Sequence, residues 1–519
     1  MSEEKKIKSV AIVGAGAAGA ITAAAFKAEN YFERIRVFER RETPGGTWIF
    51  DSDPQPVLQV QPGKLPPDVD PPLEIPQELP QITAPDQRER FSKTPIYNSL
   101  TTNVPDIAMS FSDRHFAYGP FAPHYIPRQY LESYFSAHGT DKLLSLNTTV
   151  EDVSKLPTTT EGGLERWKLT LRKYDPVRHV DAWWEEEFDA VILANGHYSV
   201  PYVPHVEGLE EYIAAYPGRV LHSKYYRSPL PYTNKKVLII GNSASGHDLT
   251  AELVSTASLP VLQSRRSPSR WDGDTPPPGI SWKPVISSYS ASTGQIHFSD
   301  GTTLSESDID HVIYATGYKP SFPFWNAARN GGPLFDYAAN KLVGNYLHTF
   351  FRAYPTLAIV GIPRVLTFRS FEYQAIALAR LFSSRNAKSL PPAEGQEKWE
   401  REREERTRRE RRKFHDVNWE SGETFAWLGA LFDIAGLGTL RGEGRIPPAL
   451  TEEVIWAIEH VRKYPEPGKG KDGDGDKGDK KKENEIDISS ESRQKDGKER
   501  RDGEWVLVER QHKDLLAFI

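Results

Sequence analysis

Residues 10–30 read VAIVGAGAAGAITAAAFKAEN, an apolar run that passes through a glycine-rich turn into an alanine-rich stretch. This order predicts a strand, a tight turn and a helix. In the G-x-G-x-x-G spacing each glycine has its own role. Gly14 permits the turn, Gly16 lets the backbone approach a pyrophosphate, and Gly19 allows close packing of helix on strand. The stretch therefore predicts a dinucleotide-binding unit. The positions expected to line the phosphates at the positively polarised helix start are Gly14, Gly16, Ala17, Ala18 and Gly19.

The next predicted strand, residues 35–40, carries an acidic residue at its end. Glu39 stands 20 residues after Gly19, where an acid binds ribose hydroxyls and repels a 2′-phosphate. Downstream, the PGGTW motif adds backbone donors and an indole plane near a flavin. FAD is therefore expected at this first loop; the alternative is a glycine-rich turn beside an unrelated surface glutamate. The further positions expected to contact FAD here are Arg40, Gly46, Thr47 and Trp48.

A second strand–turn–helix pattern, VLIIGNSASGHDLTAEL, spans residues 237–253. Gly241 and Gly246 keep the outer glycines of the motif, while Ser243 stands at the middle position and lowers its specificity. The strand that follows ends on a hydroxyl and two guanidinium groups, which suit a phosphate. This favours NADPH over NADH; the alternative is a pair of solvent-facing arginines. The positions expected to contact the nucleotide are Gly241, Ser243, Ala244, Ser245, Gly246, Ser264, Arg265 and Arg266.

Two such units, with further apolar strands and helical patterns between them, predict an α/β fold with two Rossmann-like nucleotide-binding domains. The NADPH-binding domain is expected to be inserted in the FAD-binding domain, beside an antiparallel β excursion. Ten prolines between residues 51 and 90 disfavour regular helix or central strand, so this stretch should run extended over the surface. The expected division is a first part of the FAD-binding domain at 1–220, the NADPH-binding domain at 221–312, a second FAD-binding part with C-terminal helices at 313–464, a low-complexity disordered tail at 465–504 and a C-terminal segment at 505–519.

The composition narrows the class of protein. In 519 residues the formal net charge is −6, the hydrophobic share is 38% and cysteine is absent. Such a chain can bury real cores, but it has no overall basic field for nucleic acid, no thiol chemistry and no cysteine metal site. No apolar run reaches the roughly 18 residues of a membrane span, and no signal peptide is recognised, so a soluble cytoplasmic protein is expected. Residues 397–413 carry four Glu–Arg pairs at i,i+4 and predict an exposed helix.

Between the two loops, residues 216–227 read YPGRVLHSKYYR. This stretch resembles the fingerprint F-x-G-x-x-x-H-x-x-x-(F/Y) of the flavin-containing monooxygenases, with Tyr216 in place of the leading Phe. Further motifs follow the order of the family from about residue 7 to residue 385, among them GGTW, LTTN, ANGHY, ATGY and EYQA. The related Baeyer–Villiger enzymes carry Trp where this chain has Tyr226, which favours oxygenation of nitrogen or sulfur.

The resemblance also implies roles for individual residues. In the family the fingerprint lies on the linker between the two domains, so Gly218 would give the backbone freedom and His222 a fixing hydrogen bond. By similarity to soluble fungal members, Asn103 would sit beside the flavin and help organise the peroxide, and Gln374 would contact the ring region. Taken alone, His222 is typical of a packed imidazole, Asn103 of a turn former and Gln374 of an exposed helix position. Further cofactor contacts are implied at Thr102, Val150, Gly196, Thr316 and Gly317.

The activity implied by the resemblance is a monooxygenation that depends on NADPH and O2. NADPH would reduce FAD, NADP⁺ would stay bound, and molecular oxygen would add to the reduced ring as a flavin hydroperoxide. The lone pair of a small, soft nitrogen or sulfur nucleophile would then attack the terminal oxygen, so the protein mainly excludes water and needs no nucleophile of its own. Two alternatives stay open: a Baeyer–Villiger-type ketone oxygenase and a FAD-binding protein without catalysis. The physiological substrate and the oligomeric state, a homodimer included, stay open as well.

Overall fold

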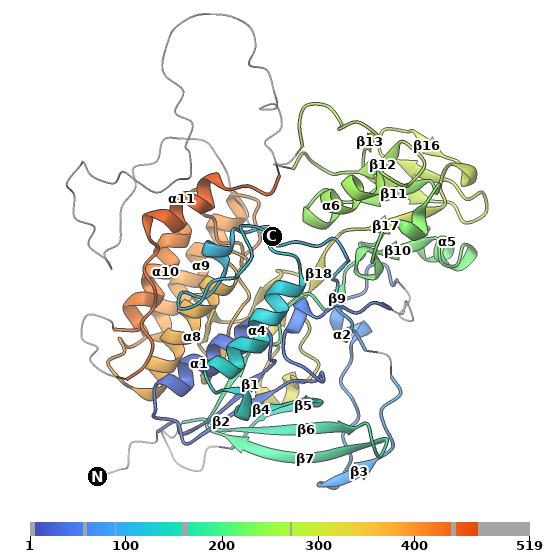
Figure 1. Ribbon diagram of the computed structural model, residues 1–519. Helices are drawn as coiled ribbons and strands as arrows, with labels where there is room; N and C mark the ends of the chain where they lie inside the picture. Colours follow the sequence, from blue (N-terminus) through green and yellow to red (C-terminus); the bar gives the residue numbers. More distant parts are fainter. Residues whose placement is uncertain are drawn as a thin grey trace, which may run out of the picture.

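The computed structural model describes residues 6–54, 60–88, 90–157, 164–269, 272–436 and 443–464. Two sheets with parallel cores form separate parts of the molecule, at the lower centre and the upper right of Figure 1. The larger sheet has the strand order β21-β22-β23-β8-β1-β2-β4, and the smaller has the order β10-β17-β11-β12-β13. The predicted α/β fold with two Rossmann-like units is confirmed. The predicted tail and C-terminal segment, 465–504 and 505–519, lie outside the described residues.

The seven-stranded sheet is built around β1 (Ser9–Val13). This strand lies parallel between β2 (Arg34–Phe38) and β8 (Ala190–Leu193). A central parallel strand must be covered on both faces, which explains why its sequence is an unbroken apolar run. One layer over the sheet contains α1 (Ala17–Ala28) and α8 (Phe368–Ser383), which pack side by side (Figure 1). The outer strands are β4 (Leu144–Ser145), β23 (Tyr354–Ile359), β22 (Phe350–Phe351) and β21 (Asn345–Tyr346).

The five-stranded sheet is parallel throughout. The predicted boundaries at 220/221 and 312/313 cut β10 and β17, which are hydrogen-bonded to each other in this sheet. An apolar strand fits either parallel sheet, and only its partner strands show to which sheet it belongs. We therefore propose to place both strands whole in the second domain. Its elements are α5 (Leu209–Ala215), β10 (Val220–His222), β11 (Val237–Ile240), α6 (Ala244–Leu253), β12 (Val261–Ser264), β13 (Ile280–Lys283), β14 (Ile286–Tyr289), β15 (Ile296–Phe298), β16 (Thr303–Leu304) and β17 (His311–Tyr314).

The chain crosses between the two sheets twice, and the two crossings pair with each other. β9 (Val200–Pro201) on the outward path lies antiparallel to β18 (Tyr318–Lys319) on the return path. The connection is therefore a short two-stranded ribbon, which restricts the relative motion of the two sheets more than two separate loops would.

An antiparallel sheet accounts for the predicted β excursion. Its strand order is β3-β7-β6-β5. β3 (Gln81–Thr83) comes from the proline-rich stretch and lies at the edge, where a residue without an N–H donor does least harm. The same stretch forms one short helix, α2 (Pro66–Val69), whose prolines stand in the first turn and so remove no intrahelical hydrogen bond. The other strands are β5 (Thr148–Lys155), β6 (Trp167–Asp175) and β7 (Val180–Phe188).

The predicted charged helix at 397–413 is present as α9 (Ala393–Arg409). The prediction that it is exposed is wrong for one of its faces. Two of the four expected surface pairs come within hydrogen-bonding distance. However, Glu400, Arg403 and Thr407 are buried along one face of the helix. Arg403 donates to carboxylate and carbonyl groups of the neighbouring segment, which satisfies its buried charge. The charge pattern indicated the local pairs but not these partners from elsewhere in the chain.

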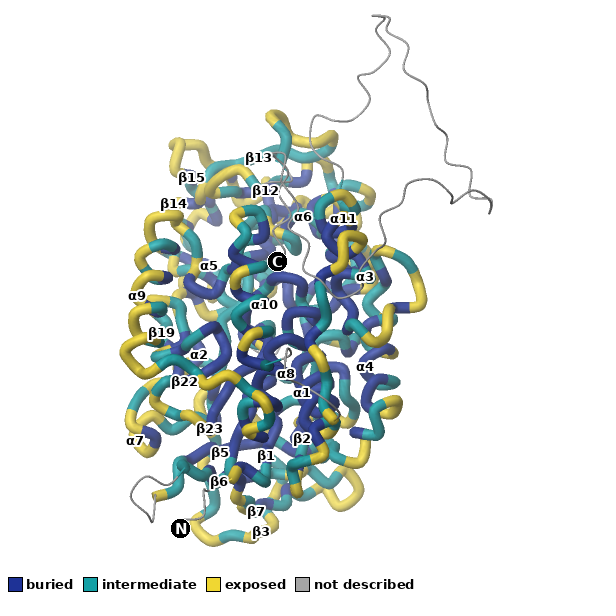
Figure 2. Tube along the Cα trace, turned by 90° about the vertical axis from the view of Figure 1, so that its left-hand side faces the viewer, coloured by how far each residue is buried: buried dark blue, intermediate teal, exposed yellow. Residues whose placement is uncertain are grey.

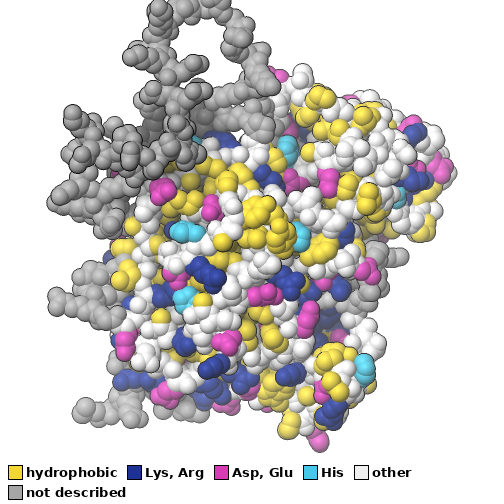
Figure 3. Space-filling view, viewed as in Figure 1, with side chains coloured by type: hydrophobic (Ala, Val, Ile, Leu, Met, Phe, Trp, Pro, Cys, Tyr) yellow, Lys and Arg dark blue, Asp and Glu magenta, His cyan; other side chains and the backbone are white. Residues whose placement is uncertain are grey.

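Burial follows this layered arrangement. Figure 2 shows the buried chain along β1, α1 and α8 and exposed chain on outer loops and α9. On the face seen in Figure 3, basic and acidic side chains lie interspersed. In the described ranges, no helix is long and apolar enough to cross a membrane. The remaining elements are α3 (Asp106–Met109), α4 (Tyr125–Ala137), α7 (Ala327–Asn330), β19 (Phe335–Asp336), β20 (Lys341–Leu342), α10 (Glu423–Ile434) and α11 (Glu452–His460).

Candidate cofactor and oxygenation site

The first glycine loop joins β1 to α1 at the carboxyl edge of the larger sheet. Gly14 has a φ of +106°, and a Cβ there would lie 2.6 Å from the carbonyl oxygen of Ala194. A Cβ on Gly19 would lie 2.0 Å from the carbonyl oxygen of Gly14. Both glycines are therefore required by the turn and by helix–strand packing, as predicted. Gly16 is the N-cap of α1, and the first-turn N–H groups beyond it lack intrahelical acceptors, which fits a pyrophosphate. Ala17 and Ala18 begin that turn.

The GGTW turn lies directly against this loop. A Cβ on Gly46 would approach the Cα of Gly16 to 2.7 Å, and the Gly45 amide donates to the Ala15 carbonyl at 3.0 Å. The structure thus brings together two stretches that the sequence analysis assigned to one cofactor. The indole of Trp48 packs edge-on against a phenylalanine of α8, with 6.3 Å between the ring centroids. It is therefore held by the core, and Thr47 beside it is half-buried.

Glu39 is buried at the tip of β2 and is bound to the glycine loop itself. Its Oε2 accepts from the Ala15 amide at 2.8 Å, and its Oε1 accepts from the Arg41 amide at 2.9 Å. A carboxylate offers about four acceptor sites, so capacity remains for ribose hydroxyls. Arg40 is accessible to solvent and donates to the Phe91 carbonyl at 3.1 Å.

The second glycine loop repeats the geometry of the first. Gly241 has a φ of +111°, and a Cβ there would lie 2.6 Å from the Ala315 carbonyl oxygen. A Cβ on Gly246 would lie 2.2 Å from the carbonyl oxygen of Gly241. Ser243 is the N-cap of α6 with a φ of −82°, close to the −78° of Gly16, so a serine fits this position without strain. Ala244 and Ser245 begin α6 as Ala17 and Ala18 begin α1.

The strand tips beside the two loops correspond as well. The amide of the first glycine donates to the tip of the next strand in both, to Phe38 at 2.8 Å and to Ser264 at 2.9 Å. Arg265 therefore occupies the place in the second unit that Glu39 occupies in the first. The two nucleotide-binding units are therefore related, and they differ in the residue at this strand tip, which is acidic in the first unit and basic in the second.

Arg265 is held in place by two neighbours. Its Nη1 donates to Asp272 at 2.8 Å, and its Cζ lies 3.3 Å from the ring centroid of Trp282. The same Asp272 oxygen accepts from the Asn242 amide group at 2.9 Å, so the carboxylate also ties the glycine loop to this arginine. Arg266 is exposed. Sequence reasoning did not identify Asp272 or Trp282, because neither belongs to the local motif.

The fingerprint linker is held by an internal histidine. His222 is buried; its Nδ1 accepts from the Lys224 amide at 3.0 Å, and its Nε2 donates to the Gly317 carbonyl at 3.1 Å. Burial, with Lys224 nearby, lowers the pKa of His222 to about 3, so the ring is neutral. The predicted hydrogen bond therefore joins the end of β10, which belongs to the five-stranded sheet, to the start of the return crossing after β17. Gly218 has a φ of +77°, and a Cβ there would meet open space, so its conformation alone favours glycine.

Two cations of the linker had no assigned role in the sequence analysis. Arg227 donates to the carbonyl oxygens of Asp51 at 2.6 Å and Thr94 at 2.9 Å, which ties the linker to both ends of the proline-rich stretch. Lys224 is buried and donates to the Ser199 carbonyl. Desolvation lowers the pKa of Lys224 to about 7. Arg227 directly follows the last fingerprint position, Tyr226, and this place next to the motif is the signal in the sequence that could have indicated its contacts.

Asn103 lies just before α3 and is half-buried. No hydrogen bond links its side chain to any residue of the described ranges, so its amide is free to bind a ligand. The neighbouring Thr102 is buried, and its hydroxyl accepts from the Ala122 amide at 2.9 Å. Contact of Asn103 with a flavin stays a prediction. Of the other expected contacts, Val150 is buried in β5, Gly196 and Gly317 have positive φ angles beside the ends of β8 and β17, and Thr316 donates to the Tyr202 carbonyl.

Gln374 is fully buried on α8, so its alternative interpretation as an exposed helix position is wrong. Its Oε1 accepts from the Gly361 amide at 3.1 Å, and its Nε2 donates to the Thr349 hydroxyl at 2.9 Å. A Cβ on Gly361 would lie 3.3 Å from the side chain of Ala18 in the first turn of α1. Gln374 thus fixes a loop that borders the first glycine loop. Its contact with the flavin ring stays a prediction.

Comparison with known protein families shows to which family the chain belongs. The profile of the flavin-binding monooxygenase-like family matches residues 85–272, and that of an NAD(P)-binding Rossmann-like domain matches residues 12–69. The chain is 30% identical over 436 residues to the flavin-containing monooxygenase iboF of Amanita muscaria (strain Koide BX008), covering 74% of this chain and 80% of that relative. This chain belongs to the flavin-containing monooxygenase family. The cofactors of the family, FAD and NAD(P)H, fit the two glycine loops.

Other relatives of this flavin-containing monooxygenase support the same family assignment. FMO GS-OX5 of Arabidopsis thaliana is 29% identical over 392 residues, 73% of this chain and 74% of that one. Among solved structures, S-allyl-L-cysteine S-oxygenase from Allium sativum has a TM-score of 0.64 at 27% identity, covering 82% of this chain and 88% of that one. Cyclohexanone monooxygenase in its open form has a TM-score of 0.52 at 12% identity, covering 83% of this chain and 98% of that one. It shares the fold alone.

Proposed function

We propose that this flavin-containing monooxygenase uses NADPH and dioxygen to oxygenate a soft nitrogen or sulfur nucleophile. The observation that carries the proposal is Tyr226, at the linker position where the Baeyer–Villiger enzymes carry Trp. Its hydroxyl donates to Glu252 at 2.9 Å, and its ring stacks on Tyr232 with 5.6 Å between centroids. The S-oxygenase named among the similar structures supports oxygenation of sulfur.

We assign FAD to the first loop and NADPH to the second. The first loop combines backbone donors at the start of α1 with Glu39, which suits an unphosphorylated ribose. The second combines the same backbone arrangement with Arg265 and Arg266, which suit a 2′-phosphate. The bound flavin supplies the redox and oxygen-activating chemistry. We assign to Asn103 the role of holding the reacting end of the cofactor, because its amide is free and half-buried.

The test of the reaction is product analysis with the purified holoenzyme, NADPH and air. A thioether, a tertiary amine and a cyclic ketone are offered in parallel. We expect an S-oxide or N-oxide, in which one oxygen atom of O2 enters the product and the other leaves as water, with two electrons from NADPH. Formation of lactone from the ketone, without S- or N-oxide, would instead establish a Baeyer–Villiger enzyme. Absence of flavin reduction by NADPH would indicate a non-catalytic FAD protein.

The choice of nicotinamide cofactor is tested at the exposed arginine. Replacing Arg266 with Ala should raise the KM for NADPH by about tenfold, because a charge-assisted hydrogen bond to phosphate is worth about 1.5–3 kcal/mol. The KM for NADH in the same variant serves as the matched control and should not change. Equal use of NADH and NADPH by the unaltered enzyme would contradict the assignment.

A further inference from the structure

Helix α6, which begins at the second glycine loop, carries two carboxylates one turn apart. Asp248 and Glu252 stand at i and i+4 and so lie on the same side of the helix. Both are bound by groups from outside the five-stranded sheet. Neither carboxylate belongs to the dinucleotide motif as the sequence analysis interpreted it.

Asp248 is the meeting point of three side chains from two distant segments. The hydroxyls of Tyr97 and Tyr464 both donate to its carboxylate, and Lys463 Nζ lies 3.4 Å from its Oδ2. Lys463 also donates to the backbone carbonyl of Thr101 at 3.5 Å. Burial and the neighbouring carboxylate raise the pKa of Tyr97, so its hydroxyl stays a donor.

Glu252 extends the same contact by one turn. Its Oε2 accepts from the Ser99 hydroxyl at 3.0 Å and from the Tyr226 hydroxyl at 2.9 Å. The acidic side of α6 is therefore bound by the segment around residue 98, by the fingerprint linker and by the end of the described chain. In Figure 1 the chain leaves α11 and runs toward α6.

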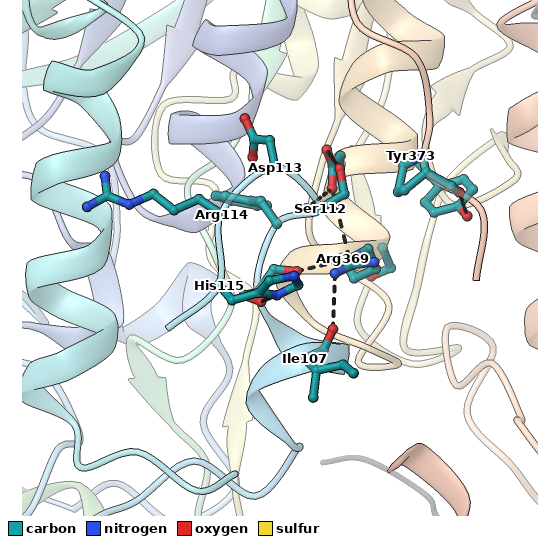
Figure 4. Close-up of polar contacts among 12 residues, drawn as sticks. Ile107, Ser112, Asp113, Arg114, His115, Arg369 and Tyr373 are labelled. Carbon is teal, nitrogen blue, oxygen red and sulfur yellow. Dashed lines mark hydrogen bonds and ion pairs between the residues drawn. The ribbon is translucent and has the colours of Figure 1, made fainter. Parts of the chain in front are cut away.

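The far end of this C-terminal strap, residues 443–464, is anchored on the larger sheet. Arg445 donates to Asp113 and to Glu372 of α8, both at 2.8 Å. Figure 4 shows the same region: Arg369 of α8 binds the Ile107 carbonyl, and the loop carrying Asp113 lies over the helix. Between these ends, α11 packs against α3. The strap therefore spans from the helices over the larger sheet to a helix of the smaller one.

We propose that Asp248 is a positioning residue, which the strap uses to fix α6 and its nucleotide-binding loop relative to the larger sheet. The loop and Asp248 belong to one short helix, so a change in the direction of α6 moves the bound nucleotide with it. Holding α6 would therefore keep the second glycine loop, and a nucleotide bound there, in one position relative to the larger sheet. The inference rests on the family activity and on nucleotide binding at the second loop, and it is independent of which substrate atom is oxygenated.

The test compares Asp248→Asn and Tyr464→Phe with the unaltered holoenzyme. Binding of NADP⁺ to the oxidised holoprotein is measured by calorimetry, and hydrogen peroxide released per NADPH consumed reports loss of coupling. We expect NADP⁺ affinity to fall by about tenfold in Asp248→Asn, because a neutral amide weakens the charge-assisted hydrogen bonds that hold α6 to the strap. Peroxide release should rise in both variants, while the flavin content stays unchanged.

The matched control is Asp310→Asn. Asp310 accepts from the Lys236 amide at 2.8 Å within the same domain, and it has no contact with the strap among the described residues. It should keep the NADP⁺ affinity and coupling of the unaltered enzyme. Unchanged affinity and peroxide release in Asp248→Asn would overturn the proposal, and so would equal losses in Asp248→Asn and Asp310→Asn. If the unaltered enzyme itself does not bind NADPH, the assignment of the second loop is refuted instead.

Discussion

At the scale of single residues, the protein buries several histidines in the neutral form. Desolvation lowers the pKa of His197, His222, His348 and His415. The Nδ1 atoms of His348 and His415 lie 2.8 Å apart, and the Leu342 amide donates to Nε2 of His415 at 3.0 Å. Because that nitrogen accepts, His415 carries its proton on Nδ1 and donates to His348. Protonation of either ring would break this arrangement.

The stability of the protein should therefore fall in mild acid. The folded pKa of His222 is about 3, against 6.5 for an ordinary histidine. Between these values the unfolded chain binds a proton that the folded chain does not. The contribution of this residue is thus constant above about pH 6.5 and decreases by roughly 1.4 kcal/mol per pH unit below it. Urea unfolding at pH 7 and pH 5 measures the effect.

A pair of substitutions isolates the contribution of His222 from that of the carboxylates. His222→Gln should reduce the difference in unfolding free energy between the two pH values by about 2 kcal/mol. His179 is exposed, and His179→Gln should leave the difference unchanged. A pH dependence that is the same in the two variants would contradict a neutral, buried His222.

At the scale of elements, the molecule uses one strand–turn–helix unit twice. In both, the last glycine of the motif packs on the carbonyl of the first, and the first packs on an alanine carbonyl at the end of the adjacent strand. Those alanines, Ala194 and Ala315, open the ANG and ATG sequences. The glycine spacing and the neighbouring strand end are thus parts of one geometry. The units differ at the strand tip, where Glu39 faces one loop and Arg265 the other.

This repetition predicts two separable losses of cofactor. Gly19→Ala places a Cβ 2.0 Å from a backbone oxygen, and Gly246→Ala places one 2.2 Å from another. Because backbone cannot move aside cheaply, each change should disrupt its own loop. We expect Gly19→Ala to be purified without flavin absorbance. Gly246→Ala should keep its flavin but lose NADP⁺ binding, as measured by calorimetry. Loss of flavin from Gly246→Ala at unchanged protein yield would contradict the assignment of the loops.

At the scale of the whole molecule, long-range contacts hold the two sheets together. The β9–β18 ribbon and the C-terminal strap each connect parts far apart in the sequence. Arg227 adds a third connection, because its guanidinium donates to the backbone carbonyls of Asp51 and Thr94, outside the second domain. The proline-rich stretch is therefore docked on the junction between the sheets.

We expect that a lysine at position 227 cannot supply the stabilising hydrogen bonds of Arg227. The planar fork of the guanidinium reaches several carbonyls in fixed directions, whereas an ammonium is a single point charge. Arg227→Lys should lower the free energy of unfolding by about 2–4 kcal/mol, because buried carbonyls lose their donors. Denaturant unfolding measures the change. Arg219→Lys, on the same linker, is the control, since Arg219 donates to the Tyr212 hydroxyl and stacks on Tyr216 without bridging distant backbone segments. Equal effects of the two changes would refute the role of Arg227 as a clamp.

Prediction from sequence succeeded where the physics is local. A glycine with positive φ, a helix N-terminus and the residue at the next strand tip all lie within about thirty positions. The geometry of the motif is therefore determined by the local sequence. This is why the turn at Gly14 and the place of Glu39 beside it agree with the prediction, while the contacts of these residues with the cofactors stay predictions. The fingerprint likewise indicated the hydrogen bond of His222, because the family resemblance includes the place of that linker between two domains.

The two nucleotide-binding units, the α/β class and the family could be predicted from the amino-acid sequence alone. The sheet to which β10 and β17 belong, the buried face of α9 and the partners of Arg265 became known from the folded structure. It alone showed the partners of Gln374 and of Asp248, whose contact with Tyr464 joins positions 216 residues apart. The physical reason is that an apolar strand or a charged side chain indicates only the kind of partner that it requires. Which partner they meet depends on packing between segments whose separation along the chain carries no information about their distance in space.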